Sequence, residues 1–135
     1  MINFTTMPKV AFEEMNRVHS EEVELLNTLE LLLEGKENDE QIENILETLL
    51  EHTREHFSNE ERLMEEVNFP AYMMHKSEHT RVLNETQLVI LDWRTKRDNS
   101  IIKNYFLGTL TDWLPQHIAS MDTITAQFIC MHKGC

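Results

Sequence analysis

Histidine and carboxylate side chains recur along this chain at the spacing of helical turns. The sequence holds seven histidines, and five of them stand where an apolar helical stripe would otherwise continue. Neutral imidazole and carboxylate are ligands that iron, zinc and manganese accept in proteins. The side chains that could bind such a metal are His19, His56, Glu60, His75, His79, His117 and Asp122.

The first two of these histidines interrupt apolar stripes. Counted by sevens from Phe12, the first stripe reaches His19 before it continues to Leu26. In the second stripe, His56 stands at an equivalent place, and Glu60 follows one helical turn later on the same face. These three polar side chains should therefore point into the core.

The other candidates lie on two further helical segments. His75 and His79 are one turn apart on the third stripe, and His117 lies on the fourth, with Asp122 five residues later. Because five residues of α-helix turn the direction by about 140°, the fourth helix must bend or become irregular between these two side chains. Pro115, inside the helical pattern, favours a break at this point.

Four helices are needed to position these residues. Apolar side chains recur with the helical period over about 13–34, 40–66 and 70–95, and again from near residue 100. Only 3 glycines and 3 prolines leave little turn material for a sheet of many strands. The pattern predicts an all-α fold, an up-down-up-down four-helix bundle with a dinuclear metal site in its core.

The length of 135 residues fits one domain. Cys130 and Cys135 lie near the end of the chain, where we expect reduced thiols on a frayed tail. We expect a single domain over 1–135, consisting of an N-terminal arm (1–12), the bundle (about 13–125) and a C-terminal tail (about 126–135).

Charge and hydropathy exclude several classes of partner. The net charge of −12 would repel phosphate backbones and anionic membrane surfaces. The chain contains neither a signal-peptide pattern nor a run of about 18 apolar residues. We therefore expect a cytoplasmic protein that binds no nucleic acid and no membrane.

The candidate ligands point to two metal ions rather than one. A single inward histidine is usually a hydrogen-bonded core residue, but five histidines and two carboxylates without a metal would carry a large desolvation cost. Seven ligands exceed what one tetrahedral ion takes, and two carboxylates are suited to bridging. Carboxylate-rich di-iron bundles use Glu-x-x-His pairs, and no glutamate here has a histidine three residues after it. The spacing alone leaves iron, manganese and zinc open.

The pattern resembles the hemerythrin family, most closely its single-domain bacterial members. The resemblance spans about residues 10–125, and the order and gaps of all seven candidate ligands match the family. The motifs that carry it are His56-Phe57-x-x-Glu60-Glu61-x-x-Met64, His75-Lys76-x-Glu78-His79 and Trp113-Leu114-x-x-His117-Ile118-x-x-x-Asp122.

The resemblance implies a cofactor of two iron ions per chain, with an oxo or hydroxo bridge. One iron would have three histidines and a full octahedron, and the other two histidines and an open position where dioxygen binds. The implied ligands are His75, His79 and His117 for the first iron, His19 and His56 for the second, and Glu60 and Asp122 as bridges.

Reversible binding of dioxygen for storage, delivery or protection is the function that the resemblance implies, with no catalytic residue. Trp113 and Leu114 match positions that line the family's oxygen pocket, although core packing explains them equally well. Two alternatives stay open. One is a di-iron redox enzyme that turns over peroxide, nitric oxide or dioxygen with an unidentified redox partner, and the other is an oxygen or redox sensor module.

Departures from the family pattern cluster near the first histidine. Asn16 and Val18 stand where the family usually has aspartate and glutamine, which puts the hydrogen-bond support of His19 in question. His52 lies one turn before His56 and could form a hydrogen bond beside the site or relay protons. Ordinary packing or exposure is the simpler expectation for His52.

Overall fold

A computed structural model describes residues 7–35 and 39–135 of the chain, so residues 1–6 of the expected arm lie outside the described residues. This part of the chain contains helices and no strand. The all-α prediction is confirmed. The elements are α1 (Glu13–Glu34), α2 (Asp39–Glu66), α3 (Tyr72–Lys96), α4 (Asn99–Asn104), η2 (Tyr105–Thr109), α5 (Leu110–His117), η3 (Ile118–Asp122) and α6 (Thr123–Lys133).

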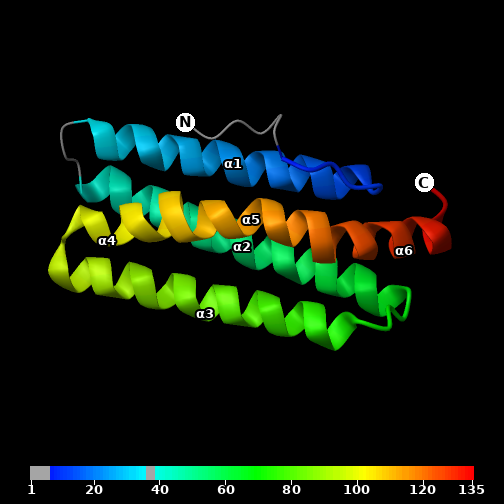
Figure 1. Cartoon of the computed structure of the whole chain (residues 1–135). Helices are drawn as coiled ribbons and strands as arrows, with labels where there is room; N and C mark the ends of the chain where they lie inside the picture. The colour runs from blue at the N-terminus through cyan, green and yellow to red at the C-terminus, as the bar shows by residue number, and fades with distance from the viewer. Residues whose placement is uncertain (1–6, 36–38) are drawn as a thin grey trace.

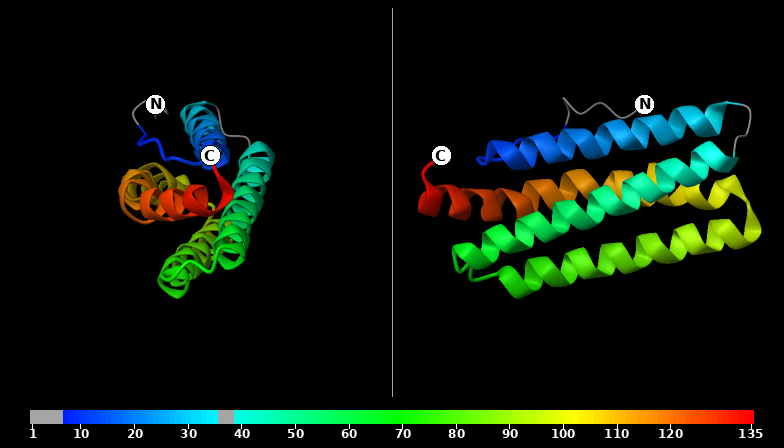
Figure 2. Two further views of the ribbon diagram at one scale, coloured as in Figure 1. Left: turned by 90° about the vertical axis from the view of Figure 1, so that its right-hand side faces the viewer. Right: turned by 180° about the vertical axis from the view of Figure 1, so that it is seen from behind.

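These elements form four antiparallel rods. The segments from α4 to α6 follow one another without a break and make the fourth rod, coloured yellow to red in Figure 1. α1 packs against α2, α2 against α3, and α3 against α4, while the fourth rod also contacts α1 and α2. Figure 2 shows the rods aligned along one long axis, which is the predicted up-down-up-down bundle.

Two hydrophobic clusters fill the bundle on either side of a polar centre. Each fully buried aliphatic side chain in them contributes about 1.5–3 kcal/mol to stability. The cluster nearer the α1–α2 and α3–α4 connections includes Leu26, Leu46, Ile90, Trp93 and Phe106. The cluster nearer the α2–α3 connection includes Met15, Met64, Leu114, Ile118 and Ile129.

The connections between helices follow their local sequence. Between α2 and α3, Asn68 has a positive φ of 53°, a conformation that asparagine tolerates better than most residues, and Phe69 beside it is buried. Arg97, which caps the end of α3, also has a positive φ. Asp98 then caps α4 by accepting a hydrogen bond from the backbone N–H of Ser100 at 3.0 Å.

The irregularity predicted between His117 and Asp122 is a π-helical turn, η3. A π-turn closes hydrogen bonds over five residues instead of four, so it brings side chains five apart onto one face. The hydroxyl of Thr123 donates to the carbonyl of Ile118, five residues earlier, at 2.7 Å. The wide turn lies after Pro115, which itself sits inside α5.

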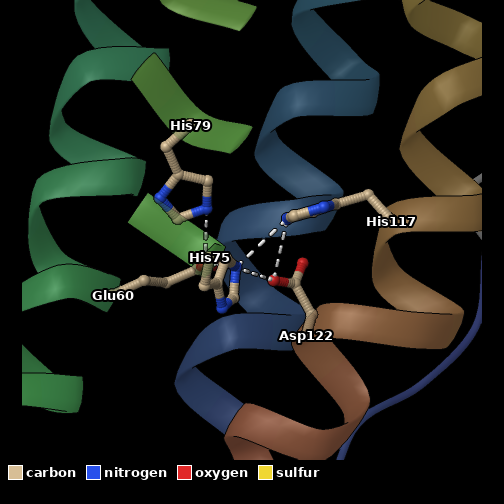
Figure 3. Close-up of side chains that lie close together, drawn as sticks. All are labelled: Glu60, His75, His79, His117 and Asp122. Atoms are coloured by element: carbon tan, nitrogen blue, oxygen red, sulfur yellow. Dashed lines mark hydrogen bonds and ion pairs between the residues drawn. The ribbon is translucent and has the colours of Figure 1, made fainter. Parts of the chain in front are cut away.

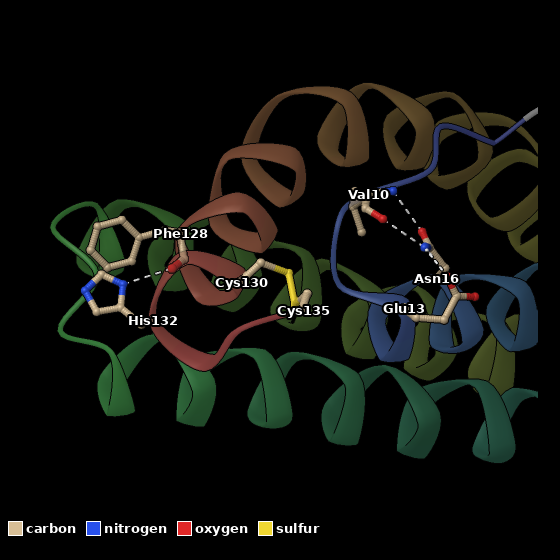
Figure 4. The surroundings of a disulfide bond; sticks show 7 residues. All are labelled: Val10, Glu13, Asn16, Phe128, Cys130, His132 and Cys135. Atoms are coloured by element: carbon tan, nitrogen blue, oxygen red, sulfur yellow. Dashed lines mark hydrogen bonds between the residues drawn. A yellow bond between two sulfur atoms is a disulfide. The ribbon is translucent and has the colours of Figure 1, made fainter.

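The end of the chain differs from the expected tail. α6 continues to Lys133, so most of residues 126–135 is helical, and Ile129 is fully buried. The expectation of reduced thiols is wrong in this structure, because Cys130 and Cys135 form a disulfide (Figure 4). Gly134, at φ 73°, turns the chain back so that the two sulfurs meet.

Candidate metal centre

All seven candidate ligands meet in the polar centre of the bundle. Each is at most 4% exposed, and they come from α1, α2, α3, α5 and η3. Their ligand atoms form two groups in which all atoms lie within 4.8 Å of one another. One group is Glu60, His75, His79, His117 and Asp122, and the other is His19, His56, Glu60 and Asp122.

The first group brings three imidazoles together, and we call it the three-histidine half (Figure 3). His75 Nε2 and His117 Nε2 lie 3.2 Å apart. Asp122 Oδ1 is 3.1 Å from the Nε2 of His75 and 3.2 Å from that of His117. The Nε2 of His79 is 3.3 Å from Glu60 Oε1. All three rings therefore point their Nε2 atoms at one space.

We call the second group the two-histidine half. It combines His19 of α1 with His56 and Glu60 of α2 and Asp122 of η3. His56 Nε2 lies 2.6 Å from Glu60 Oε2, and His19 Nε2 lies 3.0 Å from Asp122 Oδ2. The ring centroids of His19 and His56 are 5.2 Å apart. Here too the Nε2 atoms turn inward.

Both carboxylates divide their oxygens between the two halves. Glu60 turns Oε1 toward the three-histidine half, 3.3 Å from His79, and Oε2 toward the two-histidine half. Asp122 does the same with Oδ1 and Oδ2. A carboxylate that bridges two ions must present one oxygen to each, and this arrangement does so twice.

The buried polar atoms at the centre lack enough hydrogen-bond partners. Glu60 Oε1, Asp122 Oδ1 and His79 Nε2 are buried with imidazole or carboxylate neighbours at 3.1–3.3 Å but without a well-aligned hydrogen bond. The facing Nε2 atoms of His75 and His117 can share only one proton. Metal ions would satisfy all these atoms at once, and the nitrogen and oxygen donor set suits iron.

Imidazoles and carboxylates face one another at the centre and shift each other's pKa values. Burial acts to lower the pKa of His19, but Asp122 and Glu60 outweigh it and raise that pKa to about 9. His79 is likewise raised to a pKa of about 9 against its burial, by Glu60 and Glu61. Burial and repulsion from Asp122 act to raise the pKa of Glu60. The imidazoles of His56 and His19 nevertheless hold that pKa below its usual range. A metal ion that binds here must displace the protons that these raised pKa values favour on His19 and His79.

Partners behind the rings orient the three-histidine half. His75 Nδ1 is hydrogen-bonded to Thr125 Oγ1 at 2.8 Å, and His79 Nδ1 to Glu61 Oε2 at 3.0 Å. Phe57 stacks on the ring of His79, with centroids 3.9 Å apart and planes 1° from parallel. The sequence analysis did not predict this role of Thr125, although its position three residues after Asp122 places it on the same helical face.

The two residues of the expected oxygen pocket, Trp113 and Leu114, both pack beside the centre. The ring of Trp113 stacks on His117 with centroids 4.4 Å apart, and its indole N–H donates to Glu78. Leu114 is 3% exposed and belongs to the same apolar cluster as Met15 and Val23 of α1. Met15 lies one helical turn before His19 and Val23 one turn after it.

The residues near the first histidine have other partners than expected. Asn16 does not bond to His19. Its side chain accepts from the Val10 N–H and donates to the Val10 carbonyl, both at 2.9 Å, and so fastens the arm to α1 (Figure 4). His52, expected to be ordinary or exposed, lies 2.6 Å through Nδ1 from a carboxylate oxygen of Glu22. That hydrogen bond raises the pKa of His52.

Comparisons with known proteins agree on one family. A family model described as "Hemerythrin HHE cation binding domain" matches residues 10–129. The chain is 33% identical over 127 residues to "Bacteriohemerythrin" of Aquifex aeolicus (strain VF5), which covers 94% of this chain and 96% of that protein. It is 29% identical over 104 residues to the bacteriohemerythrins of Pseudomonas paraeruginosa and Pseudomonas aeruginosa, covering 77% of this chain and 65% of theirs.

No solved structure matches the chain. The resemblance carried by the three motifs is confirmed by the family model and by the similarity to the Aquifex protein. Among the described residues, no helix combines the length and the apolar character that a membrane crossing requires.

Proposed function

The chain belongs to the hemerythrin family, a family of non-heme iron proteins that bind dioxygen, and we propose that it holds two irons and binds dioxygen reversibly. Such a protein would serve the storage or delivery of dioxygen, or protection from it. The observation that carries the proposal is the division of the carboxylate oxygens: Glu60 and Asp122 each present one oxygen to the three-histidine half and one to the two-histidine half.

Each half would hold one iron. His75, His79 and His117 would bind the first, and His19 and His56 the second, with both carboxylates shared. Since the second half has one histidine fewer, it is the half with room for dioxygen. The bound iron pair would supply the two electrons that dioxygen takes up, and release would return them.

The chain's own residues supply position and a dry environment. Thr125 and Glu61 hold the rings of His75 and His79 through their Nδ1 atoms. We propose that Leu114, with Met15 and Val23 of the same cluster, forms the apolar wall that keeps water from the two-histidine half. Trp113, stacked on His117, would limit access next to that ring.

One experiment separates the proposed carrier from its alternatives. The iron-loaded chain is reduced anaerobically, exposed to air and then evacuated in one cuvette, with iron analysis of the same sample. We expect two irons per chain and an absorption band that appears with dioxygen and disappears on evacuation. Iron that becomes oxidised at once and does not return would overturn the carrier in favour of a redox enzyme with an unidentified electron donor.

If the chain is an oxygen sensor instead, the same samples should give a different result. A sensor should change its hydrodynamic size or its contacts when dioxygen binds, whereas a carrier should not. Size-exclusion chromatography under nitrogen and under air therefore distinguishes the two. The cytoplasmic location expected from the sequence stays a prediction that cell fractionation would test.

A further inference from the structure

Glu22 is a buried carboxylate that the metal centre does not use. It lies in α1 and is 4% exposed. Both of its oxygens contact α2: Oε2 is 2.6 Å from His52 Nδ1, and Oε1 accepts a hydrogen bond from the hydroxyl of Thr53 at 3.1 Å. These three residues, which we call the seam cluster, cross-link α1 to α2. Apolar side chains of similar volume would stabilise the two helices at least as well, so stability alone does not explain the cluster.

The seam cluster lies one helical turn from the two-histidine half. Glu22 follows His19 by three residues on α1, while His52 and Thr53 precede His56 by four and three residues on α2. Residues three or four apart share a helix face. The ring centroids of His52 and His56 are accordingly 6.3 Å apart. Any change in the spacing of the two helices at the cluster must therefore reach His19 and His56.

The ring of His19 lacks the kind of support that the rings of His75 and His79 have. His75 and His79 each have a hydrogen-bond partner behind the ring, in Thr125 and Glu61. His19 Nδ1, by contrast, is buried without a hydrogen-bond partner among the described residues. The position of the His19 ring thus depends on where α1 itself lies relative to α2.

The cross-link continues outward to the surface. His52 Nε2 lies 3.1 Å from Glu21 Oε1, and Glu21 in turn accepts from Arg17 at 2.6 Å. Two consecutive glutamates of α1 therefore hold both nitrogens of one imidazole of α2. This fixes the ring of His52 and, with it, the register of the two helices.

We propose that Glu22, His52 and Thr53 are positioning residues that keep His19 and His56 at the spacing needed by the second metal ion. The inference rests on the proposed dinuclear centre. Partners that are hydrogen-bonded to metal ligands typically change metal affinity by about ten- to a hundredfold. The seam cluster acts one contact further out, so its loss should weaken one ion of the pair by about the lower end of that range and leave the other in place.

The test is a titration of the metal-free chain with Co²⁺ under anaerobic conditions. The double variant Glu22→Leu/His52→Leu removes the closest pair of the cluster together, and the Thr53 hydroxyl can turn to a backbone carbonyl one helical turn earlier. This costs much less stability than leaving Glu22 or His52 unpaired. We expect it to bind one Co²⁺ per chain as tightly as the wild type and a second about tenfold or more weakly, with an unchanged helical circular dichroism spectrum. Glu24→Leu, at an exposed glutamate of the same helix, is the matched control and should bind both ions normally.

A conservative variant keeps the inference testable if the double variant fails to fold. Glu22→Gln retains an oxygen acceptor for His52 or Thr53, and it should recover part of the second ion's affinity. Two unchanged ions in the double variant would overturn the inference, as would equal weakening of both ions. A wild-type chain that takes only one Co²⁺ would overturn the dinuclear centre itself, so the two failures are distinguishable.

Discussion

Glu60 and His56 lie one turn apart on α2, and Glu60 Oε2 is 2.6 Å from His56 Nε2. The same carboxylate directs its other oxygen to His79 of α3, at 3.3 Å. One side chain thus links the two halves of the centre, and it is buried with Oε1 lacking a hydrogen bond. Loss of Glu60, like loss of Asp122, should therefore affect both metal ions.

Replacing Glu60 by alanine should abolish loading with two ions, because a shared ligand and a buried countercharge are lost together. Metal analysis of the iron-loaded variant should find at most one ion per chain. Glu55→Ala is the control, since Glu55 lies on the same helix but is exposed. Retention of two ions by the Glu60 variant would contradict its proposed role as a bridge.

Thr125 should matter for the three-histidine half alone. Thr125→Val removes the hydrogen bond to His75 Nδ1 with little change in volume, and we expect the ion of that half to bind about ten- to a hundredfold more weakly. Thr125→Ser should restore the affinity because it keeps the hydroxyl. Co²⁺ titration measures both, with Thr80→Val at an exposed position as the control. An unaffected Thr125→Val variant would show that the hydrogen bond does not orient the ring.

Because Asn16 holds the N-terminal arm against α1, a change at this residue should lower the stability of the fold. Asn16→Asp keeps the acceptor for the Val10 N–H but loses the donor to the Val10 carbonyl, so two oxygens would face each other. We expect a loss of about 1–2 kcal/mol in unfolding free energy. Thermal unfolding of the variant is compared with that of Asn44→Asp, at an exposed residue of α2. Equal stability of the two variants would be the contrary result.

Metal uptake should depend on pH. Raised pKa values of about 9 mean that His19 and His79 of the metal-free protein keep their protons below that pH. Metal must displace these protons, so Co²⁺ affinity should increase as the pH rises toward about 9 and level off above it. Titrations at about pH 6.5, 7.5 and 8.5, with proton release followed in weak buffer, test this. An affinity that stays constant over this range would contradict it.

The fold was predictable because its signal repeats. Apolar residues recur every seven positions through each helix, and a histidine in such a series, as at His19 between Phe12 and Leu26, must share the inward direction of its neighbours. The structure accordingly brings the seven candidate ligands together. Their spacing on the helix faces was enough to predict that they would lie together, and their role as metal ligands stays a prediction.

What escaped prediction depends on contacts between helices. Glu22 belongs to a run of acidic residues that resembles a solvated face, and only its position opposite His52 and Thr53 makes it a buried residue. The disulfide likewise depends on a reversal of the chain at Gly134, which brings Cys135 back to Cys130. Neither relationship is periodic along the sequence.

The π-helical turn η3 also bears on how this chain tolerates changes in length. One residue added to a regular α-helix rotates everything after it by about 100°, and this would turn Thr125 and Ile129 away from the core. A π-turn absorbs the added residue locally, and the fourth rod contains two of them, η2 and η3, on either side of α5. Each of these turns already holds one residue more than an α-helical turn, so deleting a single residue from η3 should restore a regular turn and rotate the buried face of α6 out of register with the bundle.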